Sequence, residues 1–430
     1  MAAEAREAPP RDAWARERQA LGRRRLGLLG GTTTWGDAIV ALRYAAGDAE
    51  VVEGPCIGEY EREFASTIGV RQAVSFATGR LGLYAILRAL DVGEQDEVLL
   101  QVPTHIVVPN AVRYVGARPV YVDCRLDTYG IDLHQAESRI TPRTRAIVLQ
   151  HTFGVPAPLD DALALARRHG LELIEDCVHS LGATFADRQV GSFGRAAFFS
   201  TEDTKTISTT MGGMVVTDDA DLAARIRHFQ ARCARPPRSL SARYALKLAL
   251  YQLLTQPHLH RYARTAYERL GRRNPLPQAT DADERRGERP RGYEVRLSNA
   301  QAHLGLRQLR RLRANLDHRE AVVAAYARRL AELGYEAPRP PAASRPAYVR
   351  YPVWVDDRAA AVRRVAPHAV LGTWFTSVLE EAESPRHGGY ERSSCPNAEA
   401  VATHLVNLPT HPRVTLRDVD AITRALGPRR

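Results

Sequence analysis

The stretch FFSTEDTKTISTTMGGMVVT, residues 198–217, contains two apolar runs separated by a polar loop. The first run ends at Ser200 and the second begins at the Gly-Gly turn of residues 212–213, which predicts two neighbouring strands joined by a loop that carries Lys205. Similar β-branched runs recur between residues 70 and 220 and alternate with helical stretches. This alternation predicts an α/β fold with a mainly parallel sheet covered by helices on both faces.

The alternation predicts a seven-stranded sheet. The predicted strands are Ala73–Thr78, Glu97–Val102, Pro119–Asp123, Arg145–Gln150, Leu171–Asp176, Ala196–Ser200 and Gly212–Thr217. In open α/β sheets, ligands bind beyond the carboxyl ends of the strands. We therefore look for functional residues at those ends, where the sequence places Thr78, Gly79, Thr104, His105, Asp176 and Ser200.

A chain of 430 residues is long enough for more than one domain. We expect a flexible extension at residues 1–25, a large α/β domain at 26–300 and a smaller C-terminal α+β domain at 301–430. A long helix is predicted from about 300 to 333. Residues 236–290 are rich in arginine and proline, which indicates an insert in the large domain.

The insert is predicted to contain an amphipathic helix. Its apolar stripe consists of Leu240, Tyr244, Leu248, Tyr251 and Leu254, which recur at helical spacing. The arginines and Lys247 fall on the other, polar side of the predicted helix. A stripe of this size needs a cover, and three covers stay open: the large domain, a partner subunit or a membrane surface, the last being least favoured. A place beside the substrate entrance would bring Arg243 and Arg261 near an anionic substrate.

Composition excludes several classes of function. The formal net charge is +11, but it is spread along the chain with no basic block interleaved with aromatic residues, which argues against a nucleic-acid partner. The five cysteines are scattered, so neither disulfides nor a metal site are expected. The first residues lack the apolar core of a secretory signal, and no run reaches the roughly 18 apolar residues of a membrane span, so we expect a cytoplasmic protein.

Lysine occurs only at positions 205 and 247, because almost all of the positive charge is arginine. Because arginine replaces lysine almost everywhere else in this chain, the lysine at position 205 indicates a role that arginine could not perform. Lysine loses its proton when a pocket desolvates it and can then attack a carbonyl group, whereas arginine stays charged. A solvated loop lysine is the alternative interpretation.

The stretch LELIEDCVHSLGA, residues 171–183, predicts a buried strand that ends at Asp176, with His179 three residues later. Considered alone, Asp176 is more readily an N-cap than a functional carboxylate, and His179 could be a hydrogen-bonded core histidine. The position of Asp176 at a strand end of the same sheet as Lys205 favours a shared site.

Many segments carry a family resemblance. They are EGPCIGEYEREFASTIGV (53–70), ATGRLGL (77–83), DEVLLQVPTHIVVPNAVRYVGARPVYVD (96–123), QHTFGVPAPLDDALALARRHGLELIEDCVHSLGA (150–183), GSFG (191–194), the lysine loop, GYEVRLSNAQAHLGLRQL (292–309) and NLPTHP (407–412). From about Gly54 onward, the sequence resembles the sugar aminotransferase family named after DegT, DnrJ and StrS. Members of that family are pyridoxal-phosphate (PLP) enzymes of fold type I, with a large α/β domain and a smaller C-terminal domain.

The resemblance implies roles for single residues. Lys205 matches the lysine that binds the cofactor aldehyde, and Asp176 matches the partner of the pyridine nitrogen. His179 falls where relatives have a glutamine beside the PLP hydroxyl. His105 matches the residue whose flat side-chain ring packs against the face of the cofactor in relatives. Ser200 matches the residue whose hydroxyl group binds the cofactor phosphate.

Two departures from the family pattern lie near the expected phosphate. The usual Gly-Thr turn is Gly79-Arg80 here, and its backbone NH groups would hold the phosphate at a helix N-terminus. Glu294 replaces an asparagine that in relatives approaches the phosphate across the dimer interface. Because a carboxylate beside a phosphate needs a cation, we expect Arg80 and Glu294 to compensate one another, with Arg296 as a further candidate.

The resemblance implies an aminotransferase that moves an amino group from L-glutamate or L-glutamine to a keto sugar. In the leading hypothesis this keto sugar is linked to a nucleotide. The resemblance also implies a homodimer. Two alternatives stay open: an aminotransferase of a ketocyclitol or another natural-product ketone, and a non-catalytic PLP-binding regulatory or scaffold protein. A sugar dehydratase is disfavoured, because that branch of the family replaces the lysine with histidine.

Overall fold

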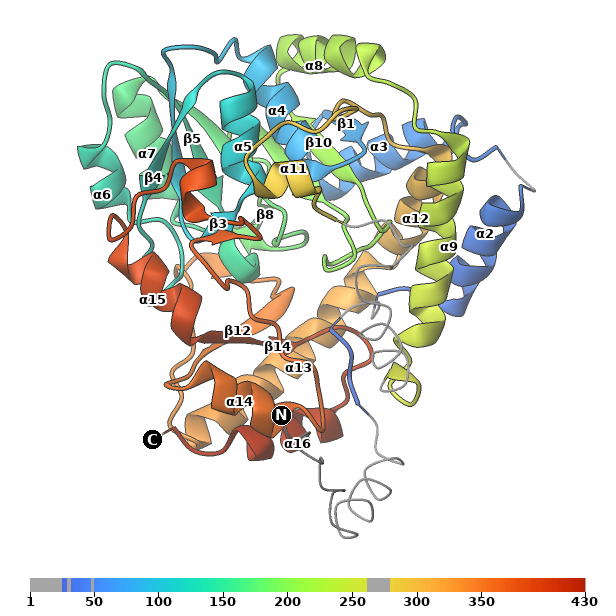
Figure 1. Ribbon diagram of the computed structural model, residues 1–430, viewed down its shortest axis with the longest axis vertical. Coiled ribbons are helices and arrows are strands. Elements are labelled where there is room, and N and C mark those ends of the chain that lie inside the picture. Colours follow the sequence, from blue (N-terminus) through green and yellow to red (C-terminus); the bar gives the residue numbers. More distant parts are fainter. Residues whose placement is uncertain (1–24, 29–31, 48–49, 261–278, 430) are drawn as a thin grey trace, which may run out of the picture.

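The computed structural model describes residues 25–28, 32–47, 50–260 and 279–429 (Figure 1). The predicted N-terminal extension lies almost wholly outside the described residues, and so does Arg261. No helix in the described part of the chain is long and apolar enough to cross a bilayer.

The predicted sheet is present. Its strands are β1 (Gln72–Phe76), β2 (Glu97–Gln101), β4 (Arg118–Val122), β5 (Thr144–Gln150), β6 (Glu172–Asp176), β9 (Ala196–Ser200) and β10 (Gly213–Thr217), in the order β1-β10-β9-β6-β5-β2-β4. Strand β10 runs in the opposite direction to the other six strands of this sheet. The predicted fold class, with a seven-stranded mainly parallel sheet, is therefore confirmed.

Helices cover both faces of the sheet because successive strand residues point to opposite sides. Val98 and Leu100 belong to one core and Leu99, between them, to the other. The first face packs against α4 (Gly79–Ala89), α5 (Val107–Tyr114) and α8 (Ala220–Arg232). The second packs against α3 (Cys56–Ile68), α6 (Leu133–Ser138), α7 (Leu159–His169) and α12 (Asn299–Leu309).

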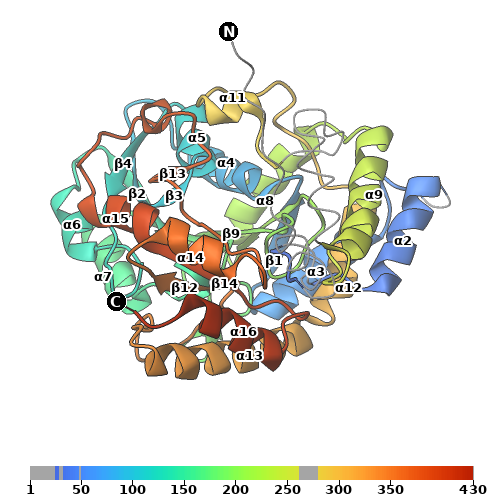
Figure 2. The same cartoon turned by 60° about the horizontal axis from the view of Figure 1, so that its bottom comes forward.

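Residues 312–429 form a C-terminal part, most of which lies below the sheet in Figure 1 and is seen from its outer side in Figure 2. It contains α13 (Leu312–Glu332), β12 (Arg350–Trp354), α14 (Arg358–Val365), α15 (Pro396–His404), β14 (Leu405–Pro409) and α16 (Leu416–Leu426). Strand β13 (Leu379–Glu380) pairs with β3 (Thr104–His105) and so brings this part to the carboxyl edge of the sheet. The domain boundaries stay a prediction.

The single long helix predicted from about 300 to 333 is wrong. Two helices, α12 and α13, occupy this range, and Arg311 between them has φ −106° and ψ 7°, outside the helical region. A break of two residues without glycine or proline leaves the apolar periodicity almost unchanged, which explains why the sequence pattern missed it.

The insert contains the predicted helix, α9 (Arg238–Leu254), and ends with the short helix α11 (Ala282–Arg285). Helix α9 lies beside α2 (Trp35–Ala46) in both views, and the two share a core cluster with α12. The predicted stripe is only partly right. Leu248 is buried, but Leu254 is exposed, and Lys247, predicted on the polar side, is buried. The buried side chains Ser241, Ala245, Leu248 and Gln252 instead define the packed face.

Candidate active site

The carboxyl ends of β1, β6 and β9 meet at one edge of the sheet. Strands β1 and β9 both pair with β10, so that Gly213 lies between Phe76 and Ser200. A Cβ atom on Gly213 would come within 2.3 Å of the carbonyl oxygen of Thr78. Glycine at this position therefore allows the chain leaving β1 to approach Ser200 closely.

Seven of the nine predicted site residues line one cavity at this edge. They are Gly79, Arg80, His105, Asp176, His179, Ser200 and Lys205. The C-terminal part contributes Trp374, Phe375 and Glu381, and the insert contributes Ala279 and Thr280. The remaining two predicted residues do not line this cavity. Arg296 borders a neighbouring cavity, and Glu294 forms an ion pair with Arg289.

Lys205 lies in the loop between β9 and β10, where its backbone NH donates to the carbonyl oxygen of Glu202 at 3.0 Å. Its Nζ lies 4.5 Å from the ring centroid of Trp374. Burial lowers the pKa of Lys205 to about 8. A lysine with this pKa is neutral in about a tenth of the molecules at pH 7, which gives a usable fraction of nucleophilic amine.

The lysine loop is fixed from beneath by a buried ion pair. Lys247 Nζ on α9 lies 2.6 Å from Asp203 Oδ2, and both side chains are almost fully buried. Asn315 Nδ2 adds a hydrogen bond of 2.8 Å to the carbonyl oxygen of Thr206. Lys247 is the only lysine of the chain besides Lys205, and this rarity is the sequence signal for the pair.

We predict that Lys247→Met lowers the free energy of unfolding by about 3–5 kcal/mol, because Asp203 would stay buried without its cation. Urea denaturation measures the change. The matched control is Arg313→Met, which removes the exposed ion pair between Arg313 and Asp317 and should cost under about 1 kcal/mol. A loss for Lys247→Met no larger than that of the control would contradict the prediction.

Asp176 presents an oxygen that the protein does not satisfy. Oδ1 accepts a hydrogen bond of 3.1 Å from the backbone NH of Val178, whereas Oδ2 is buried without a partner among the described residues. Burial raises the pKa of Asp176 to about 6. Because an unsatisfied buried acceptor costs about 1–3 kcal/mol, Oδ2 suits a ligand that carries an N–H donor, above all a positively charged one.

His105 and His179 supply neutral rings. Burial and the nearby Lys205 ammonium lower the pKa of His105 to about 3, and the same two causes hold the pKa of His179 well below its usual range. The His179 ring stacks on Trp374 with centroids 4.4 Å apart, and its Nδ1 has no partner in the described structure. A neutral imidazole can stack on a flat ligand or share a hydrogen bond with a hydroxyl group.

The N-terminus of α4 forms the anion-binding side of the cavity. Thr78 caps the helix, and its Oγ1 accepts a hydrogen bond of 3.2 Å from the NH of Leu81. The NH groups of Gly79 and Arg80 belong to the first turn, where helices leave donors for an anion. A Cβ atom on Gly79 would lie 3.0 Å from the carbonyl oxygen of Phe199, so this turn packs directly against the end of β9 near Ser200.

Arg80 and Glu294 have other partners within the chain, and their compensation across the dimer interface stays a prediction. The Arg80 guanidinium instead contacts Glu284 on α11, with Nε 2.5 Å from Oε1 and Nη2 2.7 Å from Oε2. Glu294 has Arg289 as its cation, and Arg296 Nε donates to the carbonyl oxygen of Cys233 at 3.1 Å. The insert thus supplies the carboxylate for Arg80, a contact between distant segments that no local pattern indicates.

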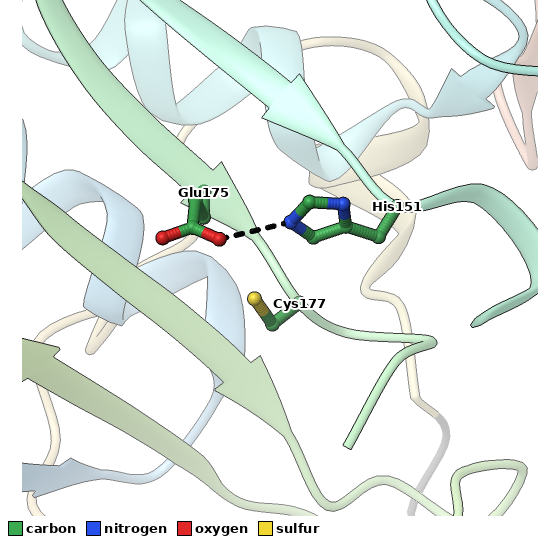
Figure 3. Close-up of side chains that lie close together, drawn as sticks. All are labelled: His151, Glu175 and Cys177. Carbon is green, nitrogen blue, oxygen red and sulfur yellow. Dashed lines mark hydrogen bonds and ion pairs between the residues drawn. The ribbon is translucent and has the colours of Figure 1, made fainter. Parts of the chain in front are cut away.

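A second polar cluster lies on the opposite side of β6 and consists of His151, Glu175 and Cys177 (Figure 3). His151 Nδ1 accepts from the NH of Ala157, so Nε2 carries the proton that is donated to Glu175 Oε2 at 3.1 Å. The Glu175 carboxylate also accepts from the backbone NH groups of residues 191, 193 and 194. With its acceptors used in this way, the cluster serves to hold the 191–194 turn against β6.

Comparison with known proteins agrees with this arrangement. The sequence pattern of the DegT/DnrJ/EryC1/StrS aminotransferase family matches residues 37–427. GDP-perosamine synthase of Caulobacter vibrioides is 32% identical over 378 residues, which cover 87% of this chain and 90% of that protein. Spore coat polysaccharide biosynthesis protein SpsC of Bacillus subtilis is 29% identical over 383 residues, covering 87% and 89%.

A solved structure is similar over nearly the whole fold. DesV of S. venezuelae, in complex with a ketimine intermediate, superposes with a TM-score of 0.70 at 27% identity, covering 91% of this chain and 94% of that one. The resemblance inferred from the sequence motifs is thereby confirmed. The chain belongs to the DegT/DnrJ/EryC1/StrS aminotransferase family.

Proposed function

We propose that this protein is a PLP-dependent aminotransferase that transfers an amino group from L-glutamate or L-glutamine to a nucleotide-linked keto sugar. The observation that carries the proposal is the meeting of Lys205 and the unsatisfied Asp176 Oδ2 in one cavity with the α4 N-terminus. The nucleotide-linked acceptor rests on the relative named GDP-perosamine synthase, whose name refers to a GDP-linked compound.

The residues of the cavity fit the cofactor. Lys205 would hold the aldehyde carbon, Asp176 Oδ2 the protonated pyridine nitrogen, and Ser200 with the NH groups of Gly79 and Arg80 the phosphate. His179 would donate or accept a hydrogen bond at the hydroxyl group of the PLP ring, and His105 would lie against the face of that ring. When bound, PLP supplies an aldehyde that exchanges amino groups and a ring that accepts electrons.

The protein's own part in the reaction is proton transfer and orientation. Lys205 Nζ, with a pKa of about 8, can take a proton from the carbon that bears the donor's amino group and later return one. The charge of Asp176 Oδ2 would keep the pyridine nitrogen of bound PLP protonated. The ion pair between Asp203 and Lys247 fixes the loop from which Lys205 acts.

Absorbance spectroscopy tests the proposal. We expect the purified protein to bind PLP with visible absorbance, to lose that absorbance on addition of L-glutamate or L-glutamine, and to regain it on addition of a nucleotide-linked keto sugar. Recovery with a free ketocyclitol but not with any nucleotide sugar would contradict the proposed acceptor. Binding of PLP without any response to amino acids would favour the regulatory or scaffold alternative.

We further propose that the protein is a homodimer in which the segment around residues 293–296 faces the partner's cofactor. Exposed apolar side chains support an interface that includes α2 and α9. On α2, Trp35 is 54% exposed, Ile39 61% and Leu42 49%, and Leu246 and Leu253 are exposed on α9. Apolar groups gathered on one face commonly mark an interaction surface.

Sedimentation tests this assembly. The wild-type protein should sediment as a dimer, and Ile39→Lys should shift it towards monomer, because a charge would be buried at the interface. Leu416→Lys, at a position that is 60% exposed on α16, is the matched control and should leave the dimer intact. A fully active wild-type monomer would contradict the shared active site.

A further inference from the structure

The last part of the insert, residues 279–288, runs along the wall of the cavity that contains Lys205, and we call it the strap. Its first two residues, Ala279 and Thr280, line this cavity beside Arg80. Thr280 is buried, so the strap packs closely against the cavity. The strap continues as α11, which lies beside α5 in both views (Figures 1 and 2). A segment that is absent from the sheet itself thus closes part of the site.

A buried ion pair anchors the strap to α4. The Arg80 guanidinium meets the Glu284 carboxylate at two points, with Nη2 2.7 Å from Oε2 and Nε 2.5 Å from Oε1. Its Nη1 donates a third bond, of 3.0 Å, to the carbonyl oxygen of Ala279. The side chain of Glu284 is only 1% exposed and that of Arg80 16%. Removing one partner of such a pair is strongly unfavourable, because the other charge stays buried alone.

The other side of the strap is tied to α5 and to the C-terminal part. Asn110 Nδ2 on α5 donates to the carbonyl oxygen of Glu284 at 2.7 Å. The backbone NH of Glu383 donates to the carbonyl oxygen of Arg285 at 3.0 Å. Arg285 Nη2 also lies 3.5 Å from Oε2 of Glu381, which itself lines the cavity. The strap therefore connects the α4 side of the cavity wall with the side that the C-terminal part supplies.

The ion pair explains why position 80 carries an arginine. Glu284 balances the charge of Arg80, so the pair adds no net positive charge where the phosphate would bind. The phosphate would rely on backbone NH groups of the α4 N-terminus and on the hydroxyl group of Ser200. A threonine, usual at this position in the family, is too short for a two-point contact with Glu284. Arg80 thus serves to reach the insert.

The proposed reaction makes closure of the cavity important. In the resting enzyme, Lys205 would hold the cofactor by a covalent bond to its aldehyde carbon. When the donor's nitrogen takes the place of Lys205 at that carbon, the amine of Lys205 is released and the cofactor becomes pyridoxamine phosphate (PMP). PMP has no covalent bond to the chain, so only non-covalent contacts and the closure of the site keep it in place.

We propose that Arg80 is a positioning residue that holds the strap closed through Glu284 and thereby retains PMP between the two halves of the reaction. The inference rests on the proposed function and adds to it a device for keeping the aminated cofactor. In this role neither Glu284 nor the Arg80 guanidinium has to touch the cofactor. The strap acts by closing the route along which PMP would leave.

The rate of PMP release tests this role. Glu284→Gln should accelerate the loss of PMP from PMP-loaded protein by roughly 30-fold or more, because one partner of a buried charge pair is removed. Rapid gel filtration at successive times measures how much PMP stays bound. Release of PLP from the PLP-loaded form should change by less than about threefold, because Lys205 holds that form covalently.

The matched control is Asp283→Asn, which removes an exposed ion pair with Arg286 inside α11 and leaves the contact with Arg80 in place. It should retain PMP like the wild type. Glu284→Asp keeps the buried charge but is too short for the two-point contact, so its release rate should lie between those of the wild type and Glu284→Gln. This milder variant decides the question if Glu284→Gln does not fold.

Hydrogen exchange of the strap gives a readout without any cofactor. The backbone amides of residues 279–288 should exchange faster in Glu284→Gln than in the wild type and in Asp283→Asn, whereas amides of the sheet should be unaffected. Unchanged exchange in the strap would show that other contacts hold it, and this would overturn the inference.

PMP release from Glu284→Gln at the wild-type rate would also overturn the inference. Slower release would do the same, because it would show that a freed Arg80 binds the phosphate directly. Equal acceleration for PLP and PMP would indicate a general loss of cofactor binding rather than a loss of retention. Failure of the proposed function looks different: the wild-type protein would bind PMP but pass its amino group to no keto sugar. The release rates of PMP would still decide about the strap in that case.

Discussion

Replacing Lys205 with alanine is expected to lower turnover by at least about 10⁴-fold, since the variant loses the covalent attachment of the cofactor and the proton-transferring amine together. The fold should persist, because the Lys205 side chain borders a cavity and makes no ion pair in the described structure. Steady-state kinetics measures the loss, and circular dichroism with urea denaturation checks the fold.

Lys205→Arg is the sharper control for this experiment. It keeps a long cationic side chain in the cavity but cannot become neutral at accessible pH, so it should be as inactive as the alanine variant. Activity in the arginine variant within about tenfold of wild type would show that position 205 only needs a positive charge. Transamination by Lys205→Ala at a comparable rate would refute the central assignment.

The sequence was sufficient to predict the sheet and most of the cavity. Asp176, Ser200 and Gly79 lie at strand ends, and parallel topology alone brings such ends together. Lys205 was identified because lysine is otherwise nearly absent from the chain. For the residues at strand ends, the apolar pattern of the sequence predicts where each strand lies. The parallel topology of the fold class then places the strand ends at one edge of the sheet.

The residues that the sequence did not reveal belong to contacts between distant segments. Glu284 reaches Arg80 across 204 positions, and Arg350 at the start of β12 meets Trp374, which lies beyond α14 in the sequence. Periodicity describes only which side of an element is apolar. The apolar periodicity therefore placed Lys247 on the polar side of its helix, although Lys247 is buried against Asp203 of the lysine loop.

The buried carboxylate of Asp176 lowers the stability of the folded protein without cofactor. Its pKa is raised from an ordinary 3.8 to about 6, so ionisation is disfavoured in the folded protein without cofactor. The cost is absent below the unfolded pKa, grows between pH 4 and 6, and is fully present at neutral pH, where the shift corresponds to about 3 kcal/mol at most. A bound pyridinium nitrogen would supply the counter-charge and remove this cost.

Asp176→Asn should therefore change two properties in opposite directions. At pH 7 the cofactor-free variant should be more stable than wild type by about 1–3 kcal/mol, with the difference vanishing near pH 4, because a neutral amide replaces the buried charge. Turnover should fall by about 100-fold or more, because an amide cannot hold the ring nitrogen protonated. Urea denaturation of the cofactor-free protein at several pH values and kinetics of the loaded enzyme measure the two effects.

The control is Asp161→Asn, at an exposed position on α7, which should alter neither stability nor turnover. Wild-type turnover in Asp176→Asn would reduce Asp176 to a cap of the following turn, and a loss of stability at pH 7 would show that the protein itself satisfies Oδ2.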